Sequence, residues 1–463
     1  MRYVSTRGEA PNLGFADTVL AGLASDGGLY VPEQYPAIGT QRLEALRGRN
    51  YAEVAFEVIA PFTGGEIPDN ALRHMIEGAY ATFSHPAVAP LVQIGPNAHM
   101  LELHHGRTLA FKDVAMQLLA RLMDHILAER DKRATIVGAT SGDTGGAAID
   151  AFAGRERTDV FILFPNGRVS AVQRRQMTTS NGANVYAVAI DGDFDDCQAI
   201  VKSMFNNVPF RSEVALSGVN SINWARILAQ VVYYVTAWLT LGGGENRSVS
   251  FSVPTGNFGD VFAGYVANRL GATIEKLVVA TNDNDVLDRA LASGVYERRA
   301  VVKTTSPSMD IAVSSNFERL LFEANARNAA TVRDAMSSLA RGGSFAIDQH
   351  ALTAMRALFV AGRCSMDDAR ARIERTLEET DIVVDPHTAV GLEVAERFQG
   401  EEPMVTLATA HAAKFPDAVE AAIGRPPDVP DRLAGVMTRE ERFDTLPNDL
   451  EAVQTYIRER RSA

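Results

Sequence analysis

Cysteine is scarce in this chain of 463 residues. The only two cysteines, Cys197 and Cys364, are far apart and stand outside any Cys-x-x-Cys pattern. They provide neither a disulfide framework nor a cysteine-based zinc site, and a reducing compartment such as the cytoplasm is expected. The nine histidines form no His-x-x-x-His or His-Glu-x-x-His pair, so no metal centre is expected either.

Net positive charge and long apolar runs are also missing. The 45 Lys+Arg residues against 57 Asp+Glu leave a net charge of −12, which argues against a nucleic-acid-binding surface. The longest uncharged stretch, residues 227–244, contains Gln230, Thr236 and Thr240 and ends in three glycines. It is short for a membrane span and is interpreted as a buried helix. Residues 1–8 lack the apolar segment of a signal peptide. We therefore expect neither a nucleic-acid nor a membrane partner.

Lysine is scarce as well, with six lysines against 39 arginines. A lysine retained in such a sequence is a candidate for a position that needs a primary amine, because arginine neither loses its proton nor forms a Schiff base. Four of the six stand in charged or mixed surroundings and are interpreted as solvated surface residues. The two that do not are Lys112 and Lys414.

Short apolar segments alternate with helical segments after about residue 95. Such alternation is typical of parallel sheets covered on both faces, so an α/β architecture is expected. Residues 1–95 lack the alternation and are expected to form a separate helical cap. We expect α/β domains over 96–245 and 246–463, the latter with a helical insertion over 316–380 and a C-terminal helix over 448–461. The expected strands are 135–139, 160–164, 185–190, 249–253, 277–280, 382–384 and 404–408, and the expected helices include 145–152, 194–205, 260–270, 285–292, 388–398 and 417–423.

Two glycine-rich turns follow expected strands and open expected helices. In parallel sheets, ligands collect beyond the carboxyl ends of the strands, where these turns lie. Residues 140–146 (Thr-Ser-Gly-Asp-Thr-Gly-Gly) and residues 255–260 (Thr-Gly-Asn-Phe-Gly-Asp) can each direct backbone N–H groups and a helix N-terminus at an anion. For one such turn alone, an N-capped helix after a glycine turn is the simpler interpretation. Neither turn matches a dinucleotide fingerprint or a P-loop.

Lys112 stands between two apolar segments, after Leu109, Ala110 and Phe111 and before the apolar helix expected over 114–127. Burial and a helix N-terminus both disfavour the charged ammonium, so both lower the pKa of this lysine. The alternative is a helix-start lysine paired with Asp113. A buried amine combined with two anion-binding turns is typical of an enzyme that uses pyridoxal phosphate.

Seven segments in order along the chain are similar to those of the threonine synthase family. The longer-chain branch of that family shares the N-terminal cap. One departure is residues 104–107, His-His-Gly-Arg, where the family pattern has phenylalanine in place of His104 and proline in place of Arg107. The segments are 5–8 (Ser-Thr-Arg-Gly), 109–113 (Leu-Ala-Phe-Lys-Asp), 140–145 (Thr-Ser-Gly-Asp-Thr-Gly), 221–226 (Ser-Ile-Asn-Trp-Ala-Arg), 256–260 (Gly-Asn-Phe-Gly-Asp), 314–319 (Ser-Ser-Asn-Phe-Glu-Arg) and 409–415 (Thr-Ala-His-Ala-Ala-Lys-Phe).

The resemblance implies a fold-type II pyridoxal phosphate enzyme that converts O-phospho-L-homoserine and water to L-threonine and phosphate. It implies that Lys112 binds the cofactor covalently and then moves protons at the substrate's Cα and Cβ. Thr409 would face the pyridine nitrogen of the cofactor, although a helix cap is the alternative for this residue. The residues that would hold the cofactor phosphate are Gly256, Asn257, Phe258, Gly259 and Asp260.

The resemblance also implies a set of substrate-binding residues. The α-carboxylate of the substrate would lie against Thr140, Ser141, Asp143 and Thr144, with the backbone rather than the carboxylate of Asp143 facing it. The substrate phosphate would contact Ser221, Asn223 and Arg226, because a planar guanidinium suits a dianion. A helix-surface position is the alternative for Arg226. Lys414 is a further candidate phosphate contact, with a position at a helix start as its alternative.

Two other functions remain open from the sequence. A related pyridoxal phosphate lyase or dehydratase, acting on serine, threonine or O-phosphothreonine, would share Lys112 and the cofactor loop without needing Arg226. A non-enzymatic protein that binds small anions would keep the two turns but not the amine, so Lys112 counts against it. We expect a monomer or a homodimer.

Overall fold

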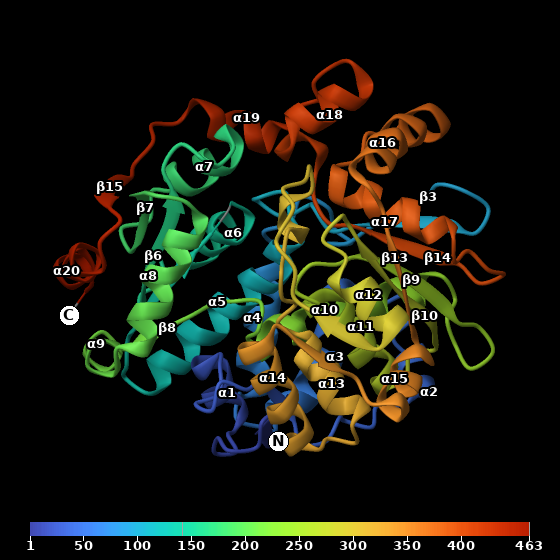
Figure 1. The fold of residues 1–463 in the computed structure, drawn as a ribbon, viewed down its shortest axis with the longest axis horizontal. Helices are drawn as coiled ribbons and strands as arrows, with labels where there is room; N and C mark the ends of the chain where they lie inside the picture. Colours follow the sequence, from blue (N-terminus) through green and yellow to red (C-terminus); the bar gives the residue numbers. More distant parts are fainter. Residues whose placement is uncertain (141, 463) are drawn as a thin grey trace.

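In the described residues the strands form two large β-sheets and two sheets of only two strands. The larger sheet has six strands, and it lies on the right in Figure 1. The structure, a computed structural model, describes residues 1–140 and 142–462. In this sheet β3 is antiparallel to β4 and all other neighbours are parallel. Its strands, in spatial order, are β13 (Phe359–Arg363), β10 (Ile274–Thr281), β9 (Val249–Pro254), β14 (Met404–Ala408), β4 (Ala98–Glu102) and β3 (Leu91–Gln93).

The alternation of side chains along β10 shows that both faces of the larger sheet are covered. Leu277 and Val279 belong to the apolar core that contains α10 (Trp224–Thr240) and α11 (Gly259–Leu270). Val278 and Ala280 belong to a second core together with residues of α16 (Met366–Thr380) and α17 (Pro386–Glu396). Strands buried on both faces tend to read as apolar runs, and the run Leu-Val-Val-Ala at 277–280 identified β10 in the sequence.

The smaller sheet is parallel throughout and lies to one side of the larger one (Figure 1). One of its faces packs against α5 (Lys112–Glu129) and α6 (Asp143–Phe152), and the other against α8 (Phe194–Asn206) and α20 (Leu450–Arg460). Its strands, in order, are β15 (Asp444–Pro447), β7 (Val185–Asp191), β6 (Thr158–Pro165), β5 (Ala134–Ala139) and β8 (Leu216–Ser217).

The two sheets exchange strands across the domain boundary expected at 245/246. β4, from the expected 96–245 unit, pairs with β14 in the larger sheet, whereas β15, from the expected 246–463 unit, pairs with β7 in the smaller one. The sheets therefore do not follow consecutive stretches of the chain. Residues before 245 contribute β3 and β4 to the larger sheet, and residues after 245 contribute β15 to the smaller one. The division into three domains stays a prediction.

The N-terminal segment packs against the central helices and is not wholly helical. Its two short strands, β1 (Tyr3–Ser5) and β2 (Tyr30–Pro32), pair antiparallel. The rings of Tyr3 and Trp224 of α10 pack at a tilt, 6.1 Å between centroids, within one core. The helices of this segment are α1 (Phe15–Ala21), α2 (Thr40–Glu44), α3 (Tyr51–Thr63) and α4 (Asp69–Tyr80).

One expectation for the C-terminal half was wrong. Residues 382–384 form no strand; they lead into Asp385, which caps α17. The segment 316–380 is mostly helical, as expected, but it also contributes β12 (Ser344–Ala346) and the edge strand β13. The remaining elements are α7 (Ala171–Thr178), α9 (Val208–Glu213), α12 (Val286–Ser293), β11 (Val295–Glu297), η1 (Pro307–Met309), α13 (Phe317–Ala324), α14 (Ala329–Gly342), α15 (Gln349–Arg356), η2 (Ala412–Lys414), α18 (Pro416–Ile423) and α19 (Asp431–Thr438).

α10 confirms the interpretation of residues 227–244 as a buried helix, since nearly all of its side chains are buried. Among the described residues, no helix has both the length and the apolar character that a membrane span requires.

Candidate active site

Lys112 is the first residue of α5 and lies at the carboxyl ends of the central strands. An isolated bridge joins Ala110 to Ala410, just after β14, and the Phe111 N–H donates to the Thr409 carbonyl at 2.8 Å. These contacts bring Thr409 beside Lys112. The side chain of Lys112 is buried, with the residue 9% exposed, so the burial that its apolar flanks predicted is found.

Two side chains from distant parts of the chain surround the Lys112 ammonium. Its Nζ lies 3.2 Å from Asp143 Oδ2 and 3.4 Å from Ser308 Oγ. Burial lowers the pKa of Lys112, and the charges of Lys414 and Arg226 lower it further, against the opposing effect of Asp143.

The alternative pairing of Lys112 with Asp113 is wrong. The Asp113 carboxylate instead accepts from the Thr108 N–H at 2.7 Å and the Thr108 hydroxyl at 2.6 Å.

Asp143 bridges the two lysines that the sequence singled out. Its Oδ1 lies 3.1 Å from Lys414 Nζ and accepts from Gln173 Nε2 at 3.0 Å. Burial alone would raise the pKa of this carboxyl, but the ammonium groups of Lys414 and Lys112 hold it well below its usual value. The carboxylate itself points at both amines. That the backbone rather than the carboxylate of Asp143 faces the substrate stays a prediction.

Lys414 is fully buried, and its ammonium has three protein partners. Besides Asp143, Nζ donates to the Thr108 carbonyl at 2.6 Å and to Gln176 Oε1 at 2.7 Å. Three acceptors occupy the three donors of an ammonium group. The structure thus gives Lys414 a role in holding Asp143 and leaves it no donor for a substrate phosphate.

The turn over residues 140–146 is braced from inside. The hydroxyl of Thr140 accepts from the N–H groups of Gly142 at 2.9 Å and Gly145 at 3.0 Å. The N–H groups of Asp143 and Thr144, at the start of α6, have no acceptor among the described residues. These two amides can therefore bind an anion. Ser141, also expected here, lies outside the described residues.

The loop over residues 256–260 leaves a larger set of amides open. Within the part of the chain that the structure describes, no protein acceptor is found for the N–H groups of residues 256–260, which lead into α11. Phe258, at the N-cap, has φ 63°, a left-handed conformation that turns the backbone sharply here. A run of free amides at a helix N-terminus is a phosphate-binding arrangement.

The side chain of Asp260 turns away from this loop. Its Oδ1 accepts from the hydroxyls of Tyr233 and Tyr234 on α10, the latter at 3.0 Å, while Oδ2 is buried without a partner. Burial raises the pKa of Asp260 to about 6. The contribution of Asp260 to an anion site is therefore its backbone N–H.

Arg226 is buried at the start of α10, 3% exposed, which rules out the helix-surface alternative. Nη1 donates to the Val219 carbonyl at 3.2 Å, and Nε has no acceptor among the described residues. Burial lowers the pKa of this guanidinium to about 10. A buried guanidinium with unused donors is suited to an anion.

The other two residues of that motif behave differently. Asn223 is fully buried; its Oδ1 caps α10 and its Nδ2 donates to the Val19 carbonyl at 2.8 Å. Its side chain thus joins the N-terminal segment to α10 instead of facing a ligand. Ser221 is half-buried, and its carbonyl accepts from Asn316 Nδ2 at 3.3 Å.

Sequence reasoning missed Ser308 and undervalued His387. The Ser308 N–H donates to His387 Nε2 at 3.2 Å, and His387 Nδ1 lies 2.7 Å from Asp385 Oδ2. Since Nε2 accepts, Nδ1 must carry the proton, and the neutral ring is held by Asp385. This chain of contacts fixes η1 against Lys112. The only local signal was Asp385 before Pro386, a helix-cap pattern.

Three family models cover most of the chain. "Threonine synthase N terminus" matches residues 2–80, "Pyridoxal-phosphate dependent enzyme" matches 94–367, and "Threonine synthase, C-terminal" matches 388–457. A threonine synthase of Pseudomonas aeruginosa is 49% identical over 460 residues, which cover 99% of this chain and 98% of that protein. The chain belongs to the threonine synthase family.

Solved structures agree with this membership. The pyridoxal-phosphate-bound threonine synthase of Brucella melitensis is 60% identical and superposes with a TM-score of 0.98 over the full length of both chains. Threonine synthase from yeast gives 0.94 at 37% identity, covering 99% of this chain and 98% of that one. The predicted fold class and pyridoxal phosphate as cofactor are thereby confirmed, and the chain is a pyridoxal-phosphate-dependent lyase.

Proposed function

We propose that this chain converts O-phospho-L-homoserine and water to L-threonine and phosphate, with the residues described above in specific roles. The observation that carries the proposal is the meeting, at one edge of the larger sheet, of a buried amine and a loop of open amides. β9 and β14 are neighbours, so the 256–260 loop after β9 and Thr409 beside Lys112 share that edge. Membership of the threonine synthase family supports the reaction.

The residues present fit pyridoxal phosphate. The five amides of residues 256–260 would hold its phosphate, Lys112 would bind its aldehyde, and Thr409 would face its ring nitrogen. When bound, the cofactor supplies a conjugated ring that accepts electron density from the substrate carbon. Gly256 lies directly against η1, since a Cβ there would come 2.7 Å from the Ser308 carbonyl oxygen. The 256–260 loop is thus packed against η1, whose Ser308 contacts Lys112.

Lys112 is placed to move protons at the substrate's Cα and Cβ. Burial lowers its pKa, which raises the fraction of neutral amine near pH 7 and makes it a better base. Asp143 then stabilises the protonated amine through the 3.2 Å contact, which is what a residue that both takes and returns a proton needs. Ser308 and its support from His387 fix the direction of the amine.

Two anion-binding groups are left for the substrate. The amides of Asp143 and Thr144, open at the start of α6, would bind the α-carboxylate. Arg226, which forms no ion pair within the described residues, would bind the phosphate that leaves. The charge of Arg226 also contributes to the lowered pKa of Lys112, which supports a phosphate position near the amine. Asn223 and Lys414 are not assigned to the substrate phosphate, because protein partners occupy their side chains.

A product assay tests the reaction. The purified holoenzyme receives O-phospho-L-homoserine, and L-threonine and phosphate are measured together. Equal amounts of the two products are expected. Phosphate together with 2-oxobutyrate would refute the hydration step, and turnover of serine or threonine with no release of phosphate from O-phospho-L-homoserine would favour the related dehydratase.

Arg226→Ala tests the assignment of the substrate phosphate. The KM for the phosphorylated substrate should rise by roughly 10-fold or more, because a charge-assisted contact contributes about 1.5–3 kcal/mol, while cofactor affinity is unchanged. An equal loss of cofactor affinity would contradict the assignment.

Location and assembly remain proposals. Both cysteines are buried free thiols, which supports a reducing compartment such as the cytoplasm. A monomer or a homodimer remains the prediction for the oligomeric state.

A further inference from the structure

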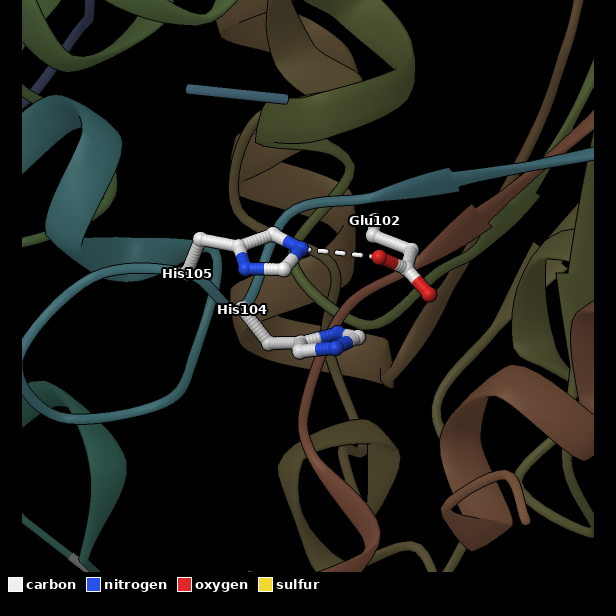
Figure 2. Close-up of side chains that lie close together, drawn as sticks. All are labelled: Glu102, His104 and His105. Carbon is white, nitrogen blue, oxygen red and sulfur yellow. Dashed lines mark hydrogen bonds and ion pairs between the residues drawn. The ribbon is translucent and has the colours of Figure 1, made fainter. Parts of the chain in front are cut away.

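A cluster of imidazole and carboxylate groups lies where the chain leaves β4. Glu102, His104 and His105 each offer one ligand atom, and these three atoms lie within 4.8 Å of one another. His105 Nε2 is 2.8 Å from Glu102 Oε2. Figure 2 shows the two imidazole rings on the same side of the connection after β4, with the Glu102 carboxylate at the edge of the His105 ring. Within the described residues, no other group of three such side chains meets.

The donors of this cluster are incompletely used by the protein. His104 Nδ1 is buried and has no hydrogen-bond partner in the described structure. Burying a polar nitrogen without a partner is costly, so such an atom calls for an explanation, and an absent ion is one of them. As whole residues, all three are only half-buried, so a solvated ion can reach them.

Two further histidines, His85 and His411, lie beside the three residues. The ring of His104 stacks on that of His105 at 5.0 Å between centroids, His411 meets His104 edge-on at 5.3 Å, and His85 lies 5.2 Å from His105. Four of the nine histidines of the chain thus gather at one point. His411 Nδ1 accepts from the Ala413 N–H at 3.1 Å and so is not free as a ligand.

We propose that Glu102, His104 and His105 form a binding site for a late first-row divalent cation, of which Zn²⁺ is the physiological candidate. Imidazole nitrogen and one carboxylate are the donors that such ions prefer over Mg²⁺ or Ca²⁺. Two histidines and one glutamate also form a known three-ligand zinc set, with the fourth position left to water. Zinc ligands lie at about 2.0–2.2 Å from the ion, so the three side chains need only small rotations to converge.

The spacing of these three residues explains why the sequence alone did not predict a metal site. Ligands on a helix repeat at three or four residues, whereas these three are at positions 102, 104 and 105 at a strand end. His104 also stands where the family pattern has phenylalanine, so that pattern gave no reason to expect a metal ligand here. The site uses no group that the proposed reaction uses, and its failure would leave the proposed function intact.

Cobalt(II) is the probe for the experiment, because its visible bands at longer wavelengths than the cofactor's report coordination by nitrogen and oxygen. The holoenzyme is titrated with Co²⁺ and the visible bands are followed. Zn²⁺ is then added to displace the Co²⁺, and the binding of Zn²⁺ is followed by calorimetry. The wild type should bind one equivalent. His104→Phe, which restores the residue of the family pattern, should weaken binding by at least about 10- to 100-fold, the loss that even a partner outside the ligand shell causes.

Two further variants keep the test decisive. Glu102→Gln keeps the shape of the side chain but removes its charge, and it should weaken Co²⁺ binding in the same range. His74→Phe removes an exposed histidine on α4 and should bind Co²⁺ like the wild type. Normal cofactor absorption in each variant shows that it is folded. The proposal is overturned if the wild type binds no Co²⁺, or if His104→Phe and His74→Phe bind it equally.

Discussion

The two glycine-rich turns have similar sequences but use their parts in opposite ways. In the 140–146 turn, the hydroxyl of Thr140 braces two amides, and the carboxylate of Asp143 faces the site between two ammonium groups. In the 256–260 loop, the amides are open and the carboxylate of Asp260 faces away, toward two tyrosines. The first turn therefore contributes a side-chain charge in addition to two open amides, whereas the second contributes its backbone alone.

The difference follows from what surrounds each acid. Asp143 is buried among cations, so its ionised form is favoured and its pKa is low, whereas Asp260 has only neutral hydroxyls in contact and its pKa is raised to about 6 by burial. A strand-turn-helix with glycines thus predicts an anion site but does not predict whether the acid inside it acts as a charge. The residues in contact with the acid, which come from elsewhere in the chain, determine whether it is ionised.

Removing the amine that Asp143 faces should have the largest effect. Lys112→Ala is expected to lower the rate of threonine formation by about 10⁴-fold, the upper range for an acid–base group, and to abolish the visible absorption band of the bound cofactor. Lys303→Ala, which removes an exposed lysine, is the matched control and should change neither. Retention of the band in Lys112→Ala would show that another group binds the cofactor.

Asp143→Asn should destabilise the fold itself. It leaves the ammonium groups of Lys112 and Lys414 buried and uncompensated, at a cost of about 3–5 kcal/mol in the free energy of unfolding. Urea unfolding of the cofactor-free protein, in which both ammonium groups are present, measures this. A loss below about 1 kcal/mol would mean that the two lysines are neutral without Asp143.

Asp260→Asn should have the opposite sign, with a pH dependence. Because the folded pKa of Asp260, about 6, is above its ordinary value of 3.8, the folded state resists ionisation and the stability of the wild type falls as pH rises from about 4 to 6. The asparagine variant lacks this loss and should be more stable than the wild type by about 3 kcal/mol at pH 7 and about equally stable near pH 3, below both pKa values. Urea unfolding at both values checks it, and a difference independent of pH would refute the raised pKa.

Gly256→Ala should have the smallest effect and act on the loop alone. The added methyl would come 2.7 Å from the Ser308 carbonyl oxygen, so the loop or η1 must shift, at a cost of about 1–3 kcal/mol in cofactor binding. Gly435→Ala meets no atom within 4 Å and should bind pyridoxal phosphate like the wild type. Titration of both variants with the cofactor compares them, and equal affinities would contradict the close packing.

The parts of the site that the sequence revealed are those with a local signature. Lysine scarcity and apolar flanks identified Lys112, and buried strands followed by glycine turns identified both anion-binding loops. Ser308 was invisible because its contact with Lys112 spans 196 residues of sequence, and the contact of His387 with Ser308 spans 79. Asn223 resembled a ligand, but its amide is used 204 residues away at Val19.

The fold shows the same limit. A central strand such as β10 is buried on both faces, and its apolar run at 277–280 can be seen in the sequence alone. β13 was missed because it is a half-exposed edge strand within a helical stretch. Residues 382–384 were wrongly expected to be a strand because two valines and an isoleucine favour one, although they only lead into a helix cap.

The place of β14 in the larger sheet has a consequence for synthesis on the ribosome. β14 is built from residues 404–408, yet it separates β4, from the first quarter of the chain, from β9. Until those late residues leave the exit tunnel, the earlier strands have no partner to join them and Thr409 has not reached the amine. A nascent or prematurely terminated chain is therefore catalytically silent, with apolar strand edges that chaperones must shield.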